Sequence, residues 1–134
     1  MEIKKTVLGP EHPETLAVMN NLASTYQNRG PLRKAEKLFV QVIEIRKTVL
    51  GPEHPETLTS MNNLALTYMA QGRLGEAEKL FVQVVETSKT ALGPEDPSTL
   101  TGMNNLALTY RSLGLLGEVE NLFVQVIETS KTVL

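Results

Sequence analysis

The chain has 134 residues, and its 13 lysine and arginine residues nearly balance its 15 aspartate and glutamate residues, for a formal net charge of −2. This balance argues against a nucleic-acid-binding protein, which normally carries a basic stripe, and against a polybasic membrane-binding surface. The absence of cysteine excludes disulfides, zinc–thiolate sites and cysteine nucleophiles. No signal peptide is visible, and no apolar run approaches the roughly 20 residues of a membrane span. We therefore expect a cytoplasmic protein that does not enter a membrane.

A repeat of 42 residues dominates the sequence. The motif Leu-Gly-Pro-Glu-His-Pro begins at Leu8 and recurs at Leu50, and it recurs again at Leu92 with aspartate in place of histidine. The first and second units are identical at 29 of 42 positions, and the second and third at 31. We therefore divide this single repeat domain into three units, which are residues 9–50, 51–92 and 93–134.

Residues 1–8 precede the first unit and match residues 43–50, the end of that unit, at most positions. We interpret them as the tail of a preceding unit whose body is absent. The chain then corresponds to a cut from a longer array or to an engineered protein.

The first half of each unit predicts an amphipathic helix. In the first unit it begins near Pro13, because proline suits the first helical turn. Its apolar residues then recur at spacings of three and four, namely Leu16, Met19, Leu22, Ala23 and Tyr26. Asp96 is a good N-cap for the corresponding helix of the third unit, whereas His12 and His54 are weaker caps at the same place. We expect these helices to end at the glycines Gly30, Gly72 and Gly114.

The second half of each unit predicts a second helix, which ends at the next Leu-Gly-Pro, since proline cannot continue a helix. Its apolar stripe in the first unit consists of Leu32, Ala35, Leu38, Phe39, Val42, Ile43 and Val49. Strand patterns are absent. Neither helix can bury its stripe alone, and stacked hairpins bury both. We predict an all-α protein, an α-solenoid of three stacked antiparallel helical hairpins.

The spacing of seven residues in the first unit resembles the signature of the tetratricopeptide repeat (TPR), namely Met19, Leu22, Ala23, Tyr26, Gly30, Ala35 and Phe39. The later units repeat it, except that Val119 stands where the family prefers a small residue. The usual period of the family is about 34 residues. The longer period, the Asn-Asn-Leu-Ala motif and the Leu-Gly-Pro joint resemble the kinesin-light-chain variety and the repeat arrays of fungal NOD-like receptors.

This resemblance implies a right-handed superhelix whose first helices line a concave groove that holds an extended peptide. Carried over position by position, it assigns the following groove residues: Asn20, Asn21, Ser24, Gln27, Asn28, Asn62, Asn63, Leu66, Met69, Asn104, Asn105, Leu108 and Arg111.

Two features of the units agree with this assignment. The copies differ at groove positions such as Gln27, Met69 and Arg111, while core positions repeat unchanged. The Asn pairs repeat although each asparagine disfavours the helix by about half a kcal/mol relative to alanine. Asparagine can donate to and accept from a peptide backbone. Alternatively, one asparagine of each pair satisfies a neighbouring helix end or loop carbonyl.

Among the asparagines, the resemblance favours Asn21, Asn63 and Asn105 as the ones that face the ligand. The middle of the predicted groove is apolar, because it contains Leu66, Met69 and Leu108, and Arg111 is its one positive charge. We therefore expect a protein or peptide ligand that is neutral to partly hydrophobic.

Catalysis needs titratable groups that converge, and the sequence offers no such group. His12 and His54 occupy equivalent joints, where we expect them to begin helices, and a third ligand for a metal shared between them is not evident. No phosphate-binding glycine loop is present. We expect neither an enzyme nor a cofactor or metal site.

Two further functions stay open. The last helix, from about Leu116 to Leu134, has an apolar stripe that a following hairpin would cover, which predicts a homo-oligomer formed through end faces or swapped helices. The chain could also be the sensing segment of a larger signalling receptor.

Overall fold

The computed structural model describes residues 12–133, without the side chains of residues 29 and 129–133. These residues form helices joined by short turns, and no strand is present among them. The helices are α2 (Pro13–Arg29), α3 (Leu32–Val49), α4 (Pro55–Ala70), α5 (Leu74–Leu92), α6 (Pro97–Ser112) and α7 (Leu116–Val133). The interpretation of residues 1–8 as the tail of a preceding unit lies outside the described residues.

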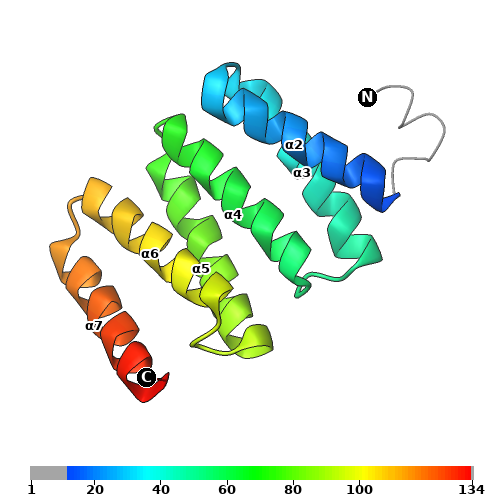
Figure 1. Cartoon of the computed structure of the whole chain (residues 1–134). Coiled ribbons are helices and arrows are strands. Elements are labelled where there is room, and N and C mark those ends of the chain that lie inside the picture. Colours follow the sequence, from blue (N-terminus) through cyan, green and yellow to red (C-terminus); the bar gives the residue numbers. More distant parts are fainter. Residues whose placement is uncertain (1–11, 134) are drawn as a thin grey trace.

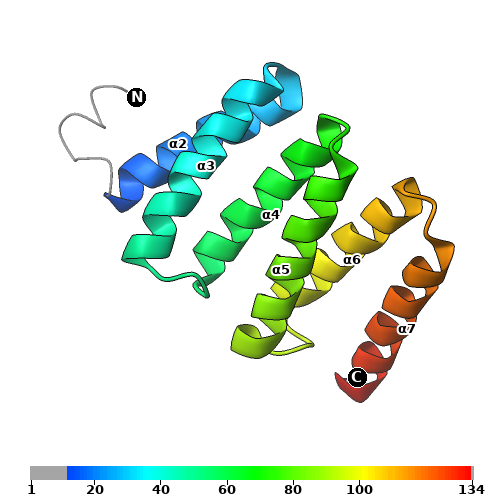
Figure 2. The same ribbon diagram turned by 180° about the vertical axis from the view of Figure 1, so that it is seen from behind.

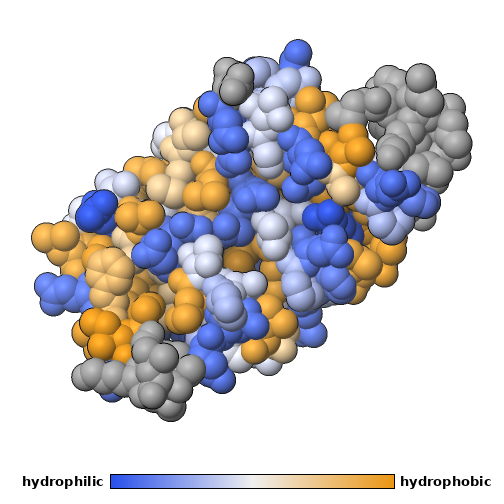
Figure 3. Space-filling model, in the orientation of Figure 1, coloured by the Kyte–Doolittle hydropathy of each residue, from blue (hydrophilic) through white to orange (hydrophobic). Residues whose placement is uncertain are grey.

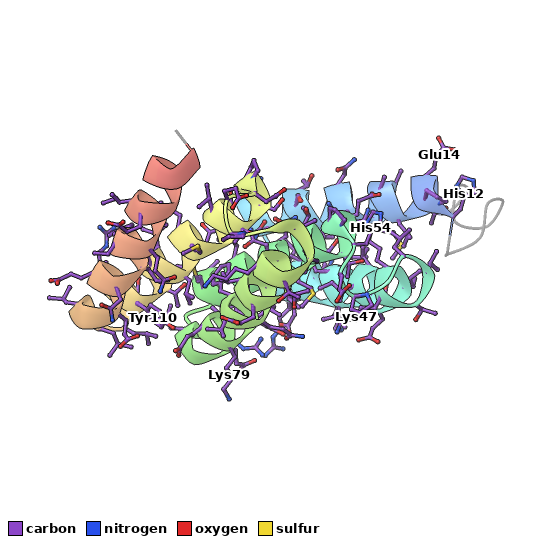
Figure 4. All side chains as sticks on the ribbon, turned by 90° about the horizontal axis from the view of Figure 1, so that it is seen from below. His12, Glu14, Lys47, His54, Lys79 and Tyr110 are labelled. Atoms are coloured by element: carbon purple, nitrogen blue, oxygen red, sulfur yellow. The ribbon has the colours of Figure 1, made fainter. Side chains whose placement is uncertain are left out.

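The first helix of each hairpin begins with proline after a residue whose side chain caps it. The Nδ1 atoms of His12 and His54 accept the backbone N–H two residues further on at 3.1 Å, and an Asp96 carboxylate oxygen does so at 2.8 Å. Figure 4 shows His12 and His54 at the beginnings of α2 and α4. The prediction that these histidines begin helices is confirmed, and each makes a complete side-chain cap.

The turn inside the first hairpin differs from the other two. In the second hairpin, Arg73 donates its N–H to the Tyr68 carbonyl at 2.9 Å, and Gly72 adopts φ +81°. The third hairpin repeats this geometry. The first hairpin has Pro31 at the position of Arg73, and proline has no N–H to donate. Gly30 therefore takes an extended φ of −170° instead of a left-handed one, although it follows the end of α2 as predicted.

The hairpins stack in two layers, α2, α4 and α6 in one and α3, α5 and α7 in the other (Figures 1 and 2). In the first layer α2 contacts α4 and α4 contacts α6, whereas no Cα atoms of the described parts of α3, α5 and α7 approach one another within 8 Å. The first layer is therefore the inner, concave side of the solenoid. The predicted fold class, an α-solenoid of three helical hairpins, is confirmed.

The core lies between successive hairpins. Phe39 of α3 and Phe81 of α5 are fully buried. Phe39 packs in one cluster with Leu58 and Met61 of the next hairpin, and Phe81 belongs to a second cluster with equivalent residues of α6. Each hairpin thus supplies one wall of its neighbour's core, as the repeat predicts.

The outer face of α7 differs from those of α3 and α5. Phe123, the equivalent of Phe39 and Phe81, is 41% exposed. Leu116, Val124 and Ile127 on the same helix are also exposed. Hydrophobic residues accordingly gather over α7, at the left edge of Figure 3.

A charged network joins the turns of the first two hairpins. Arg73 contacts Glu36 of α3 at 2.9 Å and Glu76 of α5 at 2.6 Å, and its guanidinium lies 4.5 Å from the centre of the Tyr68 ring. Burial, followed by the Glu36 charge, raises the pKa of Tyr68, and the hydrogen bond from Arg73 lowers the pKa of Glu76.

None of the helices within residues 12–133 has the length and the apolar character of a membrane span.

Candidate peptide-binding groove

The residues predicted to line a groove lie on α2, α4 and α6, the inner layer of the solenoid. Asn21, Asn28, Asn104 and Arg111 are exposed. The others are half-buried, namely Asn20, Ser24, Gln27, Asn62, Asn63, Leu66, Met69, Asn105 and Leu108. The inner layer thus combines free polar side chains with partly covered ones.

The first asparagine of a pair bonds to the following unit. The Asn20 Oδ1 atom accepts from the Ser60 hydroxyl at 3.4 Å, and the Asn62 Oδ1 atom accepts from the Asn105 amide at 3.3 Å. The side-chain amides of Asn21 and Asn63 make no hydrogen bond within the described part of the chain. Of the three asparagines favoured as ligand-facing, Asn105 therefore already has a partner, while Asn21 and Asn63 keep their donors and acceptors free.

Two of the variable positions join neighbouring units. The Gln27 side-chain amide donates to the Asn63 backbone carbonyl at 3.0 Å and to the Thr67 hydroxyl at 3.1 Å. Met69, the equivalent of Gln27 in the second unit, accepts a hydrogen bond at its sulfur from the Thr109 hydroxyl at 3.4 Å. The difference between Gln27 and Met69 therefore changes the contact between hairpins as well as the groove surface.

The apolar part of the groove is shared with the core. Leu66 and Met69 pack against the cluster that contains Phe81, so each presents only part of its side chain. Leu108 is likewise half-buried on α6. Arg111 is exposed at the end of α6, where no later hairpin is described.

A buried arginine crosses the junction between the first two hairpins, and sequence reasoning did not find it. Arg46 of α3 is only 6% exposed. Its Nη1 atom donates to the Ser60 hydroxyl at 2.6 Å and to the Glu56 carbonyl at 3.2 Å, and its Nη2 atom lies 3.6 Å from the Glu56 carboxylate. The sequence signal is the break in the repeat, because serine stands at the equivalent position, Ser88.

A cavity of about 220 Å³ lies at the junction between the second and third hairpins. Its lining includes Thr59 and Asn62 of α4 and Thr101 of α6, all inner-layer residues, and it reaches Val84 and Ser88 of α5. The groove face is therefore hollowed at this junction.

Residues 14–90 and 61–132 both match the family described as tetratricopeptide repeat, so the matches together span most of the chain. This chain belongs to the tetratricopeptide repeat family. Its 42-residue TPR units are of the kinesin-light-chain-like type.

Two crystal structures of nearly identical TPR-like repeats, from a Podosopora anserina protein assigned as a kinesin light chain, share 36% identity with this TPR chain. One of them, a form with a single substitution to methionine, superposes with a TM-score of 0.86, covering 98% of this chain and 62% of that one. The other superposes with a TM-score of 0.84, covering 98% and 63%.

A third structure shows the likeness of fold alone. BtubC (BKLC) from P. vanneervenii shares 17% identity with a TM-score of 0.88, covering 98% of this TPR chain and 53% of that protein. The chain thus spans less than two thirds of the length of each of these structures. No curated protein matches its sequence.

Proposed function

We propose that the inner layer of this TPR solenoid binds an extended segment of a partner protein. TPR units form scaffolds for interaction between proteins, which gives the class of function. The supporting observation is that Asn21 and Asn63, one unit apart on α2 and α4 of the inner layer, make no side-chain hydrogen bond within the described part of the chain. The function is one of binding and not of catalysis.

The spacing of these groups suits a peptide backbone. A side-chain amide both donates and accepts, so each asparagine can hold one peptide unit in the way a strand neighbour would. Leu66 of α4 and Leu108 of α6 are half-buried apolar residues of the same layer. A neutral to partly hydrophobic segment matches this surface.

Selection from a library of random peptides against the immobilised chain tests the proposal. The selected peptides are then titrated against the Asn63→Ala variant, with Gln83→Ala as the matched control, because Gln83 is an exposed amide on α5 of the outer layer. We expect Asn63→Ala to weaken binding about two- to tenfold, the value of one net hydrogen bond. Selection of strongly acidic peptides, or equal effects of the two variants, contradicts the proposal.

The exposed face of α7 supports a second candidate, self-association. In the first two hairpins, α4 and α6 cover the equivalents of Phe123 and Ile127, whereas Val40, the equivalent of Val124, stays exposed. A second copy of the chain carries the same exposed apolar face on α7, so the two faces can cover each other. We propose that two copies meet through Phe123 and Ile127.

Light scattering after size exclusion, over a hundredfold dilution, tests this second candidate. We expect a mass that rises with concentration above the 14.8 kDa monomer. The variant Ile127→Glu should abolish the rise, because the equivalents of Ile127 are buried by the next hairpin, and Val40→Glu, at an exposed position of α3, should leave it intact. A constant monomer mass at all concentrations refutes self-association and leaves the groove proposal unaffected.

A further inference from the structure

Three differences between units occur at the junctions of neighbouring hairpins. Arg46, Glu56 and Ser60 of the first junction correspond to Ser88, Ser98 and Gly102 of the second. Arg46 bonds to both Glu56 and Ser60, so the three replacements lie close together in space. Each replacement removes side-chain volume, and none restores it.

The cavity at the second junction is the space that Arg46 fills at the first. The second-junction cavity is lined by Leu58, Ser88 and Ser98 and has a volume of about 220 Å³. At the first junction the equivalents of those residues, Leu16, Arg46 and Glu56, line a smaller cavity of about 60 Å³ together with Pro13, Val49 and Leu50. The difference lies where the arginine side chain reaches from α3 to the beginning of α4.

The second junction also contains an unsatisfied polar group. Ser88 is fully buried, and its hydroxyl has no hydrogen-bond partner in the described structure. Buried polar groups normally have partners, and the described structure leaves three such hydroxyls unsatisfied, those of Thr15, Thr57 and Ser88, of which Ser88 is the one that lines the cavity. At the first junction the residue equivalent to Ser88 is Arg46, whose guanidinium donates hydrogen bonds to Glu56 and Ser60.

We propose that the cavity between the second and third hairpins takes an arginine side chain of the partner segment. The guanidinium would occupy the place of the Arg46 guanidinium and donate to the Ser98 carbonyl, as Arg46 donates to the Glu56 carbonyl. The walls formed by Leu58 and Val84 would cover the methylene stem. That the arginine comes from a peptide in the groove rests on the function proposed above, whereas the cavity's preference for a guanidinium does not.

The charge balance of the second junction differs from that of the first. Ser98 does not supply the carboxylate that Glu56 offers to Arg46. However, Asp96 replaces His54 at the N-cap, directly before the lining residues Pro97 and Ser98. One carboxylate therefore remains at the entrance to α6, and the surrounding groove has a half-buried amide in Asn62 and a hydroxyl in Thr101.

The binding of n-butylguanidinium, followed through backbone amide NMR signals, tests the proposal without any peptide. We expect saturable shifts at Ser88, Ser98 and Thr101, which line the cavity. We expect none at the first-junction residues Arg46, Glu56 and Ala17, the last of which is the equivalent of Thr59, because Arg46 already fills that junction. Neutral n-butylurea, which has the same shape, should shift the same signals much less. Shifts at both junctions alike, no shifts at all, or equal binding of the urea overturns the proposal.

Two variants make the test specific to this cavity. Ser88→Arg should fill it with the chain's own guanidinium and abolish the n-butylguanidinium shifts. Ser98→Glu should restore the missing carboxylate and tighten binding about two- to fivefold, as an exposed ion pair does. Unchanged binding in Ser98→Glu counts against the proposal even if Ser88→Arg folds poorly. Failure of the peptide selection with positive shifts would remove the groove function and leave the guanidinium site.

Discussion

The three phenylalanines of the repeat allow one substitution to be compared at two levels of burial. Phe81 is fully buried between the second and third hairpins, whereas Phe123 is 41% exposed on the outer face of α7. Replacement of each by alanine removes the same atoms from equivalent helices. The difference between the two losses of stability therefore reports what covers each ring.

The expected magnitudes follow from burial. Phe81→Ala leaves a cavity in a packed core, and such changes lower the free energy of unfolding by about 3–5 kcal/mol. At Phe123 solvent enters the vacated space, so only the transfer contribution of the covered part of the ring is lost, about 1–2 kcal/mol. We expect the first variant to be less stable than the second by about 2 kcal/mol or more.

Urea denaturation followed by circular dichroism measures both values, at a protein concentration low enough for a monomer. The measurement is repeated at a high concentration, where self-association would cover Phe123. Equal losses at low concentration would refute the reasoning, because they would mean that Phe123 is as well covered in the single chain as Phe81. A loss at Phe123 that grows with concentration would instead support contact between copies through α7.

Three further predictions concern local structure and pH. Gly75→Ala should raise the free energy of unfolding by about 0.5–1 kcal/mol in urea titrations, because Gly75 lies in α5 with open space around it. Gly72→Ala should instead lower the free energy of unfolding, because Gly72 adopts φ +81°. Asp96→Ala should lower the thermal stability by about 1 kcal/mol through loss of the α6 cap, and an unchanged melting temperature would contradict the capping role. The pKa of Tyr68 is raised from its ordinary value of 10.0, so the unfolded chain loses this proton first, and the free energy of unfolding should fall as the pH rises above about 10. Tyr68→Phe should reduce that fall in urea midpoints taken on either side of this pH.

The sequence predicts the hairpins and their stacking because both depend on features that recur in every unit. Apolar residues at spacings of three and four recur throughout, and Pro13 and its equivalents all begin helices. Phe39 and Phe81 are buried as the repeat requires. Periodicity is a local property of the chain, and here the packing of each unit repeats that of its neighbour.

Features that depend on single departures from the repeat were not predicted. Pro31 changes the conformation of Gly30 because it removes one N–H, an effect that a comparison of glycines alone does not reveal. The contact between Gln27 and Thr67 crosses from one unit to the next, so the variation at position 27 was assigned to the groove alone. Arg46 was overlooked because an arginine in a helix is normally solvated, and its burial depends on Ser60 in the next hairpin.

The roles predicted for the groove asparagines stay predictions in part. Asn20 and Asn62 accept hydrogen bonds from side chains of the next unit, whereas the alternative interpretation expects a bond with a helix end or a loop carbonyl. Asn21 and Asn63 have the free amides that binding requires. Which of these amides contacts a ligand depends on a partner molecule, and no property of the repeat determines it.

The two layers of the solenoid have a mechanical consequence. The inner helices already touch, through contacts such as that between Gln27 and Thr67, while the described parts of the outer helices stay apart. Further curling would compress side chains that are in van der Waals contact, whereas straightening only stretches inner contacts and brings outer helices closer. The array therefore resists further curling more strongly than it resists straightening. A pull along its axis would widen the inner surface before it disturbed the cores between hairpins.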